Sequence, residues 1–468
     1  YEMSASLVGS EMCIRDRTLP EEFIQTRKPI MGENWNLYLK EYEKEPIRGL
    51  QVNTLKIDIE TFKQKFTKKI EPIPYTINGF YLEEELKAGK DPLHHAGSYY
   101  VQEPSAMIVA NSLSIKKDSI VLDVCSAPGG KTIGISNQLQ NTGLIVANEI
   151  NPTRAKILLG NIERMGISNC VVTNFSVDQL NTLYTNTFDY IFLDTPCSGE
   201  GMFRKDEQAV KEWSLDAVEN CSKRSLELLE TISSCLKTGG YLIYSTCTFA
   251  KEENEDIIEN FLSHHSYQLL SLPESIQQVT EAGLKTSKPT EKCRRFYPYT
   301  GKGEGQFVAV LQKQEEQSGK QTNKSAIQPL TAQEKKIVIP ALKEMLSEIP
   351  EHIYQYKGKI IYYKKEDFSI PPHQILSVGV TLGTIEKNRF IPHHQFFTTF
   401  GKQIKNQLNL EKEDIRVKQY LTGYEIEDEN VADGWGALLI EGCPTGGFKA
   451  SKGKLKNHYP KGLRIFSN

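Results

Sequence analysis

The chain has 468 residues, 39% of them hydrophobic and 25% charged, which excludes a fibrous or wholly disordered protein. No apolar run approaches the ~18 residues that a membrane-spanning helix needs, so no membrane partner is expected. At ~150 residues per domain, the length predicts about three domains. The net charge of −3 gives no overall electrostatic argument for a nucleic-acid partner. Such an argument has to come from where the charges are placed.

The nine cysteines and the N-terminal segment give two further expectations. The cysteine count is odd and no C-x-x-C pair occurs, which favours a reduced, cytoplasmic protein over a disulfide or zinc framework. Residues 1–17 read YEMSASLVGSEMCIRDR, without the apolar core of a signal peptide. We therefore expect these residues to be a non-native leader.

Apolar periodicity divides the rest of the chain into modules. Residues 18–92 form an N-terminal module, with helical spacing over Glu21–Lys44 and a short strand near residues 49–55. Residues 93–313 alternate strands with amphipathic helices, which predicts an α/β fold with a doubly wound, mostly parallel sheet. Residues 314–329 read as a polar linker, and residues 330–468 form a β-rich C-terminal region. The predicted strands of the central module are Ile120–Val124, Leu144–Ala147, Cys170–Thr173, Tyr190–Leu193, Tyr241–Tyr244 and Phe307–Leu311.

A glycine-rich turn follows the first of these strands, in IVLDVCSAPGGKTIGISNQL. Gly129 and Gly130 allow a tight bend and a close approach of a ligand to the start of the next helix. Neither the dinucleotide motif nor the P-loop motif is present, so a plain strand-to-helix turn is the alternative. Glu149, at the end of the second strand, favours an adenosine-containing ligand because a carboxylate there can accept hydrogen bonds from ribose hydroxyls.

Three chemically active side chains follow the fourth and fifth strands. Asp194 ends the fourth strand, Cys197 lies in the loop beyond it, and Cys247 lies just after the fifth. The carboxyl ends of parallel strands meet at one edge, so these residues are expected to converge beside the glycine turn. A thiol in such a place can act as a nucleophile, whereas buried filler is the alternative.

The motifs DVCSAPGGKT, FLDTPCSGEGMFRKD and YSTCTFAKEENE together resemble the Sun/Fmu-type RNA cytosine-C5 methyltransferases, and within them the RsmF-type 16S rRNA enzymes. The segments PIRGLQVNTLK and GSYYVQEPSAM resemble the N-terminal RNA-binding part and the lead-in to the catalytic domain. The ending GGFKASKGKLKNHYPKGLR resembles the PUA-like RNA-binding module. The resemblance implies a Rossmann-like fold, S-adenosyl-L-methionine as cofactor and no metal.

The resemblance also implies roles for individual residues. Cys247 is expected to be the nucleophile that adds to C6 of cytosine, Cys197 to assist product release, and Asp194 to contact the base edge and the cofactor. The Pro-Cys form at Cys197 leaves the opposite assignment of the two thiols open. A third acidic contact to adenosine would fall near Ser176. The remaining cofactor-binding residues are expected to be Cys125, Ser126, Ala127, Pro128, Gly129, Gly130, Lys131 and Glu149.

An RNA partner is expected from the chemistry and from the chain's end. A target base must leave its helix to meet both thiol and cofactor. The last 21 residues hold six basic and no acidic residues, with Phe448, His458 and Tyr459 among them. Further candidates for phosphate contact are Arg204, Lys205, Arg294 and Arg295. His94–His95 and His393–His394 lack a third ligand and are expected to be structural.

The sequence thus predicts a monomeric, cytoplasmic enzyme that acts on 16S rRNA, either free or within the 30S subunit. Two alternatives remain open at this stage. One is the same chemistry on tRNA, and the other is a non-catalytic RNA-binding ribosome assembly factor.

Overall fold

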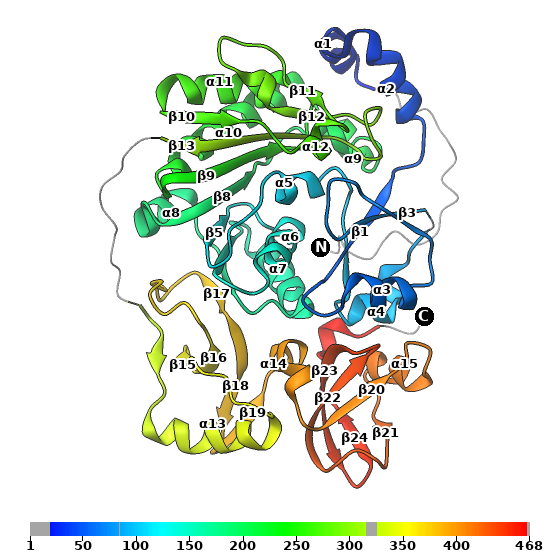
Figure 1. Cartoon of the computed structure of the whole chain (residues 1–468), viewed down its shortest axis with the longest axis vertical. Coiled ribbons are helices and arrows are strands. Elements are labelled where there is room, and N and C mark those ends of the chain that lie inside the picture. Colours follow the sequence, from blue (N-terminus) through cyan, green and yellow to red (C-terminus); the bar gives the residue numbers. More distant parts are fainter. Residues whose placement is uncertain (1–18, 84, 315–324, 466–468) are drawn as a thin grey trace.

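The computed structural model describes residues 19–83, 85–314 and 325–465. The predicted leader and most of the predicted linker lie outside these residues. Four β-sheets organise the described chain, with the largest in the middle and two smaller ones from the C-terminal region beside each other (Figure 1). Among the described residues, no helix has the length and apolar character needed to cross a membrane.

The N-terminal part combines helices with an antiparallel sheet of order β2-β3-β1-β4 (Figure 1). The predicted helical stretch forms α1 (Glu21–Met31) and α2 (Trp35–Tyr42), because Gly32 adopts a positive φ of 55° and turns the chain between them. Strand β1 (Arg48–Val52) covers most of the strand predicted here. The other elements are α3 (Ile59–Lys65), β2 (Ile70–Pro72), β3 (Gly79–Leu82), α4 (Pro92–His95) and β4 (Tyr99–Val101).

The central sheet confirms the predicted doubly wound, mostly parallel arrangement. Its order is β11-β12-β13-β9-β8-β5-β6-β7-β17, with β10 beside β13. Neighbours from β9 to β7 pair in parallel, and β13 runs antiparallel to β9. The six predicted strands are β5 (Ile120–Asp123), β6 (Leu144–Asn148), β7 (Cys170–Thr173), β8 (Phe188–Asp194), β9 (Leu236–Thr246) and β13 (Gln306–Lys313).

Helices cover both faces of this sheet because its strands are buried on both sides (Figure 1). Alternate residues along β5 show this, since Leu122 packs in one core with Leu229 of α10, whereas Val121 packs in the other with Leu158 of α7. The helices are α5 (Met107–Asn111), α6 (Gly130–Leu139), α7 (Pro152–Met165), α8 (Val177–Tyr184), α9 (Glu207–Glu212), α10 (Leu215–Ser233), α11 (Glu255–His264) and α12 (Glu274–Gln277).

Four strands of the central sheet were not predicted from the sequence. Three come from the same module, and the fourth, β17, comes from the C-terminal region and pairs antiparallel with β7. Gln374 supports this junction, because its backbone oxygen accepts from Asn174 N at 2.9 Å. The four strands are β10 (Tyr267–Leu270), β11 (Glu281–Ala282), β12 (Arg294–Phe296) and β17 (Ile375–Val378).

The C-terminal region is β-rich, as predicted, and forms two five-stranded sheets. The first comprises β14 (Gln328–Pro329), β15 (Ile353–Tyr356), β16 (Lys359–Tyr362), β18 (Val380–Glu386) and β19 (Arg389–Pro392), with α13 (Ala332–Met345). The second comprises β20 (Gln407–Leu410), β21 (Ile426–Glu427), β22 (Gly434–Ile440), β23 (Cys443–Ser451) and β24 (Lys454–Asn457), with α14 (His394–Phe400) and α15 (Ile415–Thr422).

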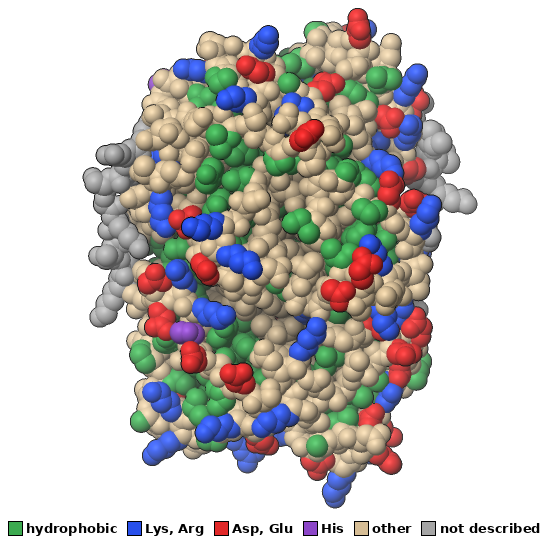
Figure 2. All heavy atoms as spheres, in the orientation of Figure 1, with side chains coloured by type: hydrophobic (Ala, Val, Ile, Leu, Met, Phe, Trp, Pro, Cys, Tyr) green, Lys and Arg blue, Asp and Glu red, His purple; other side chains and the backbone are tan. Residues whose placement is uncertain are grey.

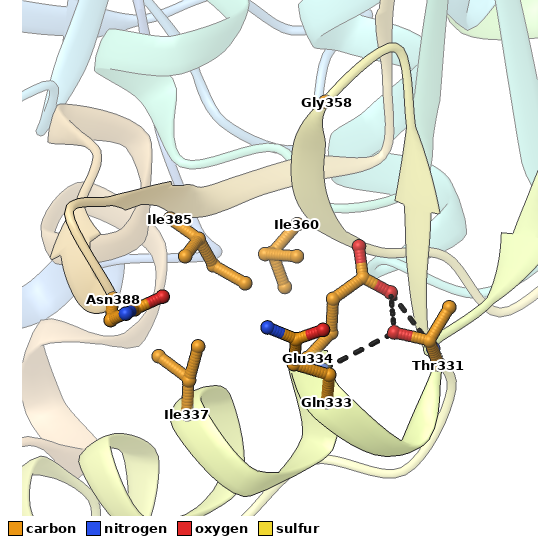
Figure 3. Close-up of a pocket in the computed structure, with 8 residues that line it drawn as sticks. All are labelled: Thr331, Gln333, Glu334, Ile337, Gly358, Ile360, Ile385 and Asn388. Atoms are coloured by element: carbon orange, nitrogen blue, oxygen red, sulfur yellow. Dashed lines mark hydrogen bonds between the residues drawn. The ribbon is translucent and has the colours of Figure 1, made fainter.

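A cavity of about 350 Å³ lies between α13 and the first of these sheets (Figure 3). Ile337, Ile360 and Ile385 supply its apolar lining. Glu334 is the one carboxylate among its lining residues, and it is used in the cap of α13. Its Oε2 accepts from Thr331 N at 2.8 Å, and Thr331 Oγ1 accepts from Glu334 N at 3.2 Å (Figure 3). This carboxylate therefore stabilises the helix start.

Candidate active site

The glycine turn after β5 has the tight geometry that its sequence predicts. Gly129 caps α6 with a φ of 119°, a left-handed conformation that residues with a side chain rarely adopt. At Gly130, a Cβ atom would lie 2.8 Å from Nε2 of Gln102. Gln51 Nε2 also donates to the Gly130 carbonyl at 2.9 Å. The turn is thus packed against the N-terminal part, and it leads directly into the start of α6.

Glu149 lies at the end of β6 with 2% of its surface exposed. Its Oε1 accepts from the backbone N of Asn151 at 2.9 Å. Its Oε2 has no hydrogen-bond partner among the described residues, although Arg154 Nη1 lies 3.4 Å away. Buried oxygens are normally paired, so this one is suited to a ligand that donates hydrogen bonds, such as a ribose.

The other residues of the predicted cofactor loop are held by contacts within the protein. Burial raises the pKa of Cys125 to about 12, so this thiol stays protonated. Ser126 Oγ donates to the Asn148 carbonyl at 2.7 Å, and Arg154 Nη2 donates to the Ala127 carbonyl at 2.9 Å. Pro128 follows a cis peptide bond, and its carbonyl accepts from Asn161. Ser176, near the position expected for a third adenosine contact, caps α8 through Gln179 N.

Lys131 and Asp194 form an ion pair at the carboxyl edge of the sheet. Nζ of Lys131 lies 2.5 Å from Oδ2 of Asp194, and each side chain is about one-fifth exposed. Burial by itself would lower the pKa of Lys131, but the adjacent Asp194 carboxylate outweighs it and raises that pKa above its usual value. Asp194 Oδ1 also accepts from Ser245 Oγ at 2.7 Å and from Gln306 Nε2 at 3.2 Å. The lysine therefore carries a fixed positive charge, and the carboxylate is held from both sides.

The two sequence-predicted thiols meet beside this ion pair. The sulfur atoms of Cys197 and Cys247 lie 3.3 Å apart. The hydrogen bond to Cys247, together with burial, raises the pKa of Cys197 well above its usual value. Cys247 is also among the groups that raise the pKa of Lys131, so the lysine charge acts on this thiol. The environment thus keeps Cys197 protonated and places a cation near Cys247.

Buried acids fix the two loops that carry the thiols. Glu253 accepts from Ser198 N at 2.9 Å and from Ser198 Oγ at 2.5 Å, and burial raises its pKa to about 7. Glu200 accepts from Phe249 N and from Arg27 Nε, both at 2.9 Å. Because Arg27 belongs to α1, this N-terminal helix supports the loops that carry the thiols.

Three family descriptions match successive parts of the chain. The N-terminal domain of 16S rRNA methyltransferase RsmF matches residues 19–104, 16S rRNA methyltransferase RsmB/F matches residues 110–312, and the RsmF PUA domain matches residues 401–465. Ribosomal RNA small subunit methyltransferase F of Shewanella sp. strain MR-4 is 32% identical over 445 residues, covering 89% of this chain and 90% of the relative. The chain belongs to the RsmF family.

Other relatives and solved structures agree with this RsmF-family assignment. The Shewanella oneidensis protein of the same name is 31% identical over 433 residues, again with 89% and 90% coverage. A methyltransferase homologue from Pyrococcus horikoshii is 29% identical with a TM-score of 0.57, covering 64% of this chain and 96% of its own. NSun6 from Pyrococcus horikoshii, solved with SFG, shares the fold at 23% identity and a TM-score of 0.54, covering 64% and 99%. This RsmF-family protein is a methyltransferase, as its motifs predict.

The structure corrects two predicted phosphate contacts of this RsmF-family chain. Arg204 is 4% exposed and donates from Nε to Glu304 Oε2 at 2.6 Å. Arg295 is 2% exposed and pairs with both carboxylate oxygens of Glu255. Both guanidinium groups are therefore structural, because a buried charge is stable only with such partners. Lys205, the neighbour of Arg204, is exposed.

The basic C-terminal segment lies on the last sheet, within the PUA match. Of the aromatic residues named there as part of an RNA-binding segment, Phe448 and Tyr459 are buried at 0% and 2% exposure, so their rings are not available to stack on RNA bases. His458 lies beside Trp435, with ring centroids 4.5 Å apart, and Lys449 Nζ lies 5.5 Å from the Trp435 ring centroid. Basic and acidic side chains are interspersed on the face shown in Figure 2. Exposed lysines of the segment are Lys449, Lys452, Lys454, Lys456 and Lys461.

Sequence reasoning missed several residues that complete the site. Ser245 and Gln306 hold Asp194, and Glu253 holds the loop of Cys197. Ser245 lies two positions before Cys247, inside the motif YSTCTFAKEENE. Because Ser245 and Asp194 both lie at the carboxyl ends of neighbouring strands, their positions could have indicated a contact. Gln306 precedes the predicted strand 307–311 by one residue, and no local signal distinguishes it.

Proposed function

We propose that the protein transfers a methyl group from S-adenosylmethionine to C5 of a cytosine in 16S rRNA. The observation that carries this proposal is the pair of thiols 3.3 Å apart beside the Lys131–Asp194 ion pair, at the sheet edge that also holds the glycine turn. The unpaired Oε2 of Glu149 and the Gly129–Gly130 turn fit the cofactor's ribose and its methionine part. S-adenosylmethionine supplies an electrophilic methyl group when it is bound.

Two thiols suit this reaction because cytosine C5 is a poor nucleophile. A Cys247 thiolate that adds to C6 forms a C–S bond and moves the ring electrons toward C5. C5 then forms the new bond to the methyl carbon as the bond between that carbon and the sulfonium sulfur breaks, and S-adenosylhomocysteine leaves with the electron pair of that bond. Afterwards C5 loses its proton, the C–S bond breaks, and the electron pair of that bond returns to Cys247 as thiolate. The Lys131–Asp194 ion pair places a positive charge near the two thiols. The Cys197 thiol, which is held protonated 3.3 Å from the Cys247 sulfur, can assist release by donating a hydrogen bond to that sulfur as it departs from C6.

The substrate is tested by bisulfite sequencing of RNA from a methylation-deficient host that expresses the protein. We expect a newly protected cytosine in 16S rRNA and none in tRNA. Protection of a cytosine in tRNA alone would show that tRNA, and not 16S rRNA, is the substrate. No protected cytosine in either RNA would leave the assembly-factor alternative.

The roles of the thiols are tested by trapping the covalent adduct. Cys197→Ala is expected to accumulate a protein–RNA adduct that resists denaturing gel electrophoresis, because C–S cleavage is impaired. Cys247→Ala is expected to form no adduct and to lose methyl transfer. Cys221→Ala, which alters a half-buried thiol of α10, serves as the matched control. An adduct in Cys247→Ala and none in Cys197→Ala would reverse the assignment.

Whether the enzyme acts on naked 16S rRNA or on the assembled 30S subunit is a separate question. We infer a cytoplasmic, monomeric enzyme that meets its target cytosine unpaired or flipped out of its helix. Comparing methylation of naked 16S rRNA with that of 30S subunits, both from the deficient host, identifies the preferred form. The exposed lysines of the C-terminal sheet support RNA binding through phosphates.

A further inference from the structure

Gln306 occupies a corner of the site that the chemistry above does not use. It is the first residue of β13, and the next residue, Phe307, pairs with Thr246 of β9. Because β13 and β9 are antiparallel, Gln306 stands at the ladder position opposite Cys247. Its side chain is buried, with 4% exposure of the residue, and Nε2 donates to Asp194 Oδ1 at 3.2 Å. A buried amide thus lies between the proposed nucleophile and the proposed base-contacting carboxylate.

The partners of Asp194 fix the orientation of this amide. A carboxylate that is ion-paired with Lys131 accepts hydrogen bonds, so it faces the NH₂ group of Gln306 and not its oxygen. The amide oxygen Oε1 is left as an acceptor, and no donor among residues 19–83, 85–314 and 325–465 bonds it. Oε1 is not among the fully buried atoms that lack a partner, so it has surface open to the site, where a donor of a bound ligand can reach it.

We propose that Gln306 is a specificity-determining residue whose Oε1 accepts a hydrogen bond from the exocyclic amino group of the target cytosine. This proposal rests on the proposed function. Cytosine carries an NH₂ group at C4, which can serve both Oε1 and the adjacent Asp194 carboxylate. Uracil has a carbonyl oxygen at that position. This oxygen would face two other acceptors, Gln306 Oε1 and the Asp194 carboxylate, with no hydrogen to share between them. A site built to bind a donor rejects an analogue that lacks it.

The test compares two RNA oligonucleotides that differ only at the methylated position mapped by bisulfite sequencing. One carries cytidine there, and the other carries pyrimidin-2-one riboside, which has no amino group. The readout is kcat/KM for methyl transfer to the cytidine RNA divided by kcat/KM for the pyrimidin-2-one RNA. In Gln306→Met, of similar size but without the acceptor, this ratio is expected to fall about tenfold or more relative to the unaltered protein. The intrinsic reactivity of the two rings cancels in this comparison.

Three further variants separate base recognition from mere positioning of Asp194. Ser245→Ala removes another donor to Asp194 and should slow both RNAs while leaving the ratio unchanged. Gln306→Glu retains an acceptor oxygen and should retain the ratio, although a second carboxylate beside Asp194 slows the reaction. Gln312→Met makes the same substitution later in β13, where the amide contacts the Gly239 carbonyl, and should change neither value.

The outcomes are distinct. If Gln306→Met has the ratio of the unaltered protein, or loses kcat/KM equally on both RNAs, Gln306 does not read the amino group. If circular dichroism shows that Gln306→Met does not fold, Gln306→Glu provides the test instead. A lower kcat/KM ratio in Gln306→Glu than in the unaltered protein overturns the proposal, and an unchanged ratio supports it. Failure of the unaltered protein to methylate the cytidine RNA would instead refute the proposed function.

Discussion

Two lysines, one partly exposed and one buried, have very different surroundings in this molecule. Lys131 lies in the site against Asp194, and this partner raises its pKa. Lys56 is 5% exposed, and its Nζ donates only to carbonyls, those of Ala96 at 2.9 Å, Arg164 at 2.8 Å and Pro444 at 2.7 Å. Burial lowers the pKa of Lys56 to about 7.

The difference teaches that the partner's charge, and not burial, decides whether a lysine here keeps its proton. The three carbonyls around Lys56 come from the N-terminal part, from α7 and from β23, so this side chain joins three modules. Lys131 therefore stays protonated, whereas Lys56 connects three modules and gains or loses its proton near neutral pH.

The largest expected effect follows from removing the charge in the site. Lys131→Met should lower kcat for methyl transfer ~10²–10³-fold, as expected for loss of a preorganised charge beside the reacting groups. Its melting temperature should change little. Lys156→Met, on the exposed face of α7, is the control and should keep full activity in the same assay. Full activity in Lys131→Met would remove any catalytic role of this charge.

The next effect is on stability. Lys56→Met should lower the free energy of unfolding by about 2–4 kcal/mol, because three buried carbonyls lose their donor. Denaturant unfolding at pH 6 measures this change. Lys402→Met provides the comparison, since Lys402 donates to the single carbonyl of Lys56 at 2.6 Å and should cost less. Equal losses in the two variants would contradict the role of Lys56 as a junction of three modules.

An effect that is smaller per pH unit concerns the pH dependence of stability. With a folded pKa of about 7 and an ordinary value of 10.5, Lys56 binds its proton more weakly in the folded state. Its contribution to stability should therefore rise with pH between these two values, by at most ~1.4 kcal/mol per pH unit. The difference in unfolding free energy between the unaltered protein and Lys56→Met, followed from pH 7 to 10, should show this slope. A pH-independent difference would mean that Lys56 does not titrate in this range.

The smallest effect concerns Glu253, the acidic counterpart of Lys56. Burial raises its folded pKa from 4.5 to about 7, so its contribution to stability should fall as pH rises from 4.5 to 7. Glu253→Gln should remove this fall, measured as a flatter pH profile of unfolding. Glu259→Gln, at a partly exposed position of α11 where the pKa of the carboxyl is lowered, should leave the pH profile of unfolding between pH 5 and 7 nearly unchanged. An unchanged profile in Glu253→Gln would place the titration elsewhere.

The sequence allowed prediction of the central sheet because its strands alternate with amphipathic helices, and of the site because Asp194, Cys197 and Cys247 follow strand ends. It could not predict Gln306 or β17, since their partners lie more than a hundred residues away. Burial of Arg204 and Arg295 was likewise hidden, because a basic residue in a sequence does not reveal that a carboxylate such as Glu304 encloses it. Contacts between residues far apart in the sequence determine where these four features lie, and the local sequence pattern does not predict such contacts.

Strand β17 carries a practical consequence for work with parts of this protein. It covers the edge of the central sheet by pairing with β7, although it lies more than sixty residues beyond the end of β13. A chain cut after Lys313 would leave the backbone N–H and C=O groups of β7 open along that edge. Unpaired edges of this kind recruit other chains, so an isolated catalytic module should self-associate. A usable fragment must keep residues 375–378 or receive a charged substitution along β7.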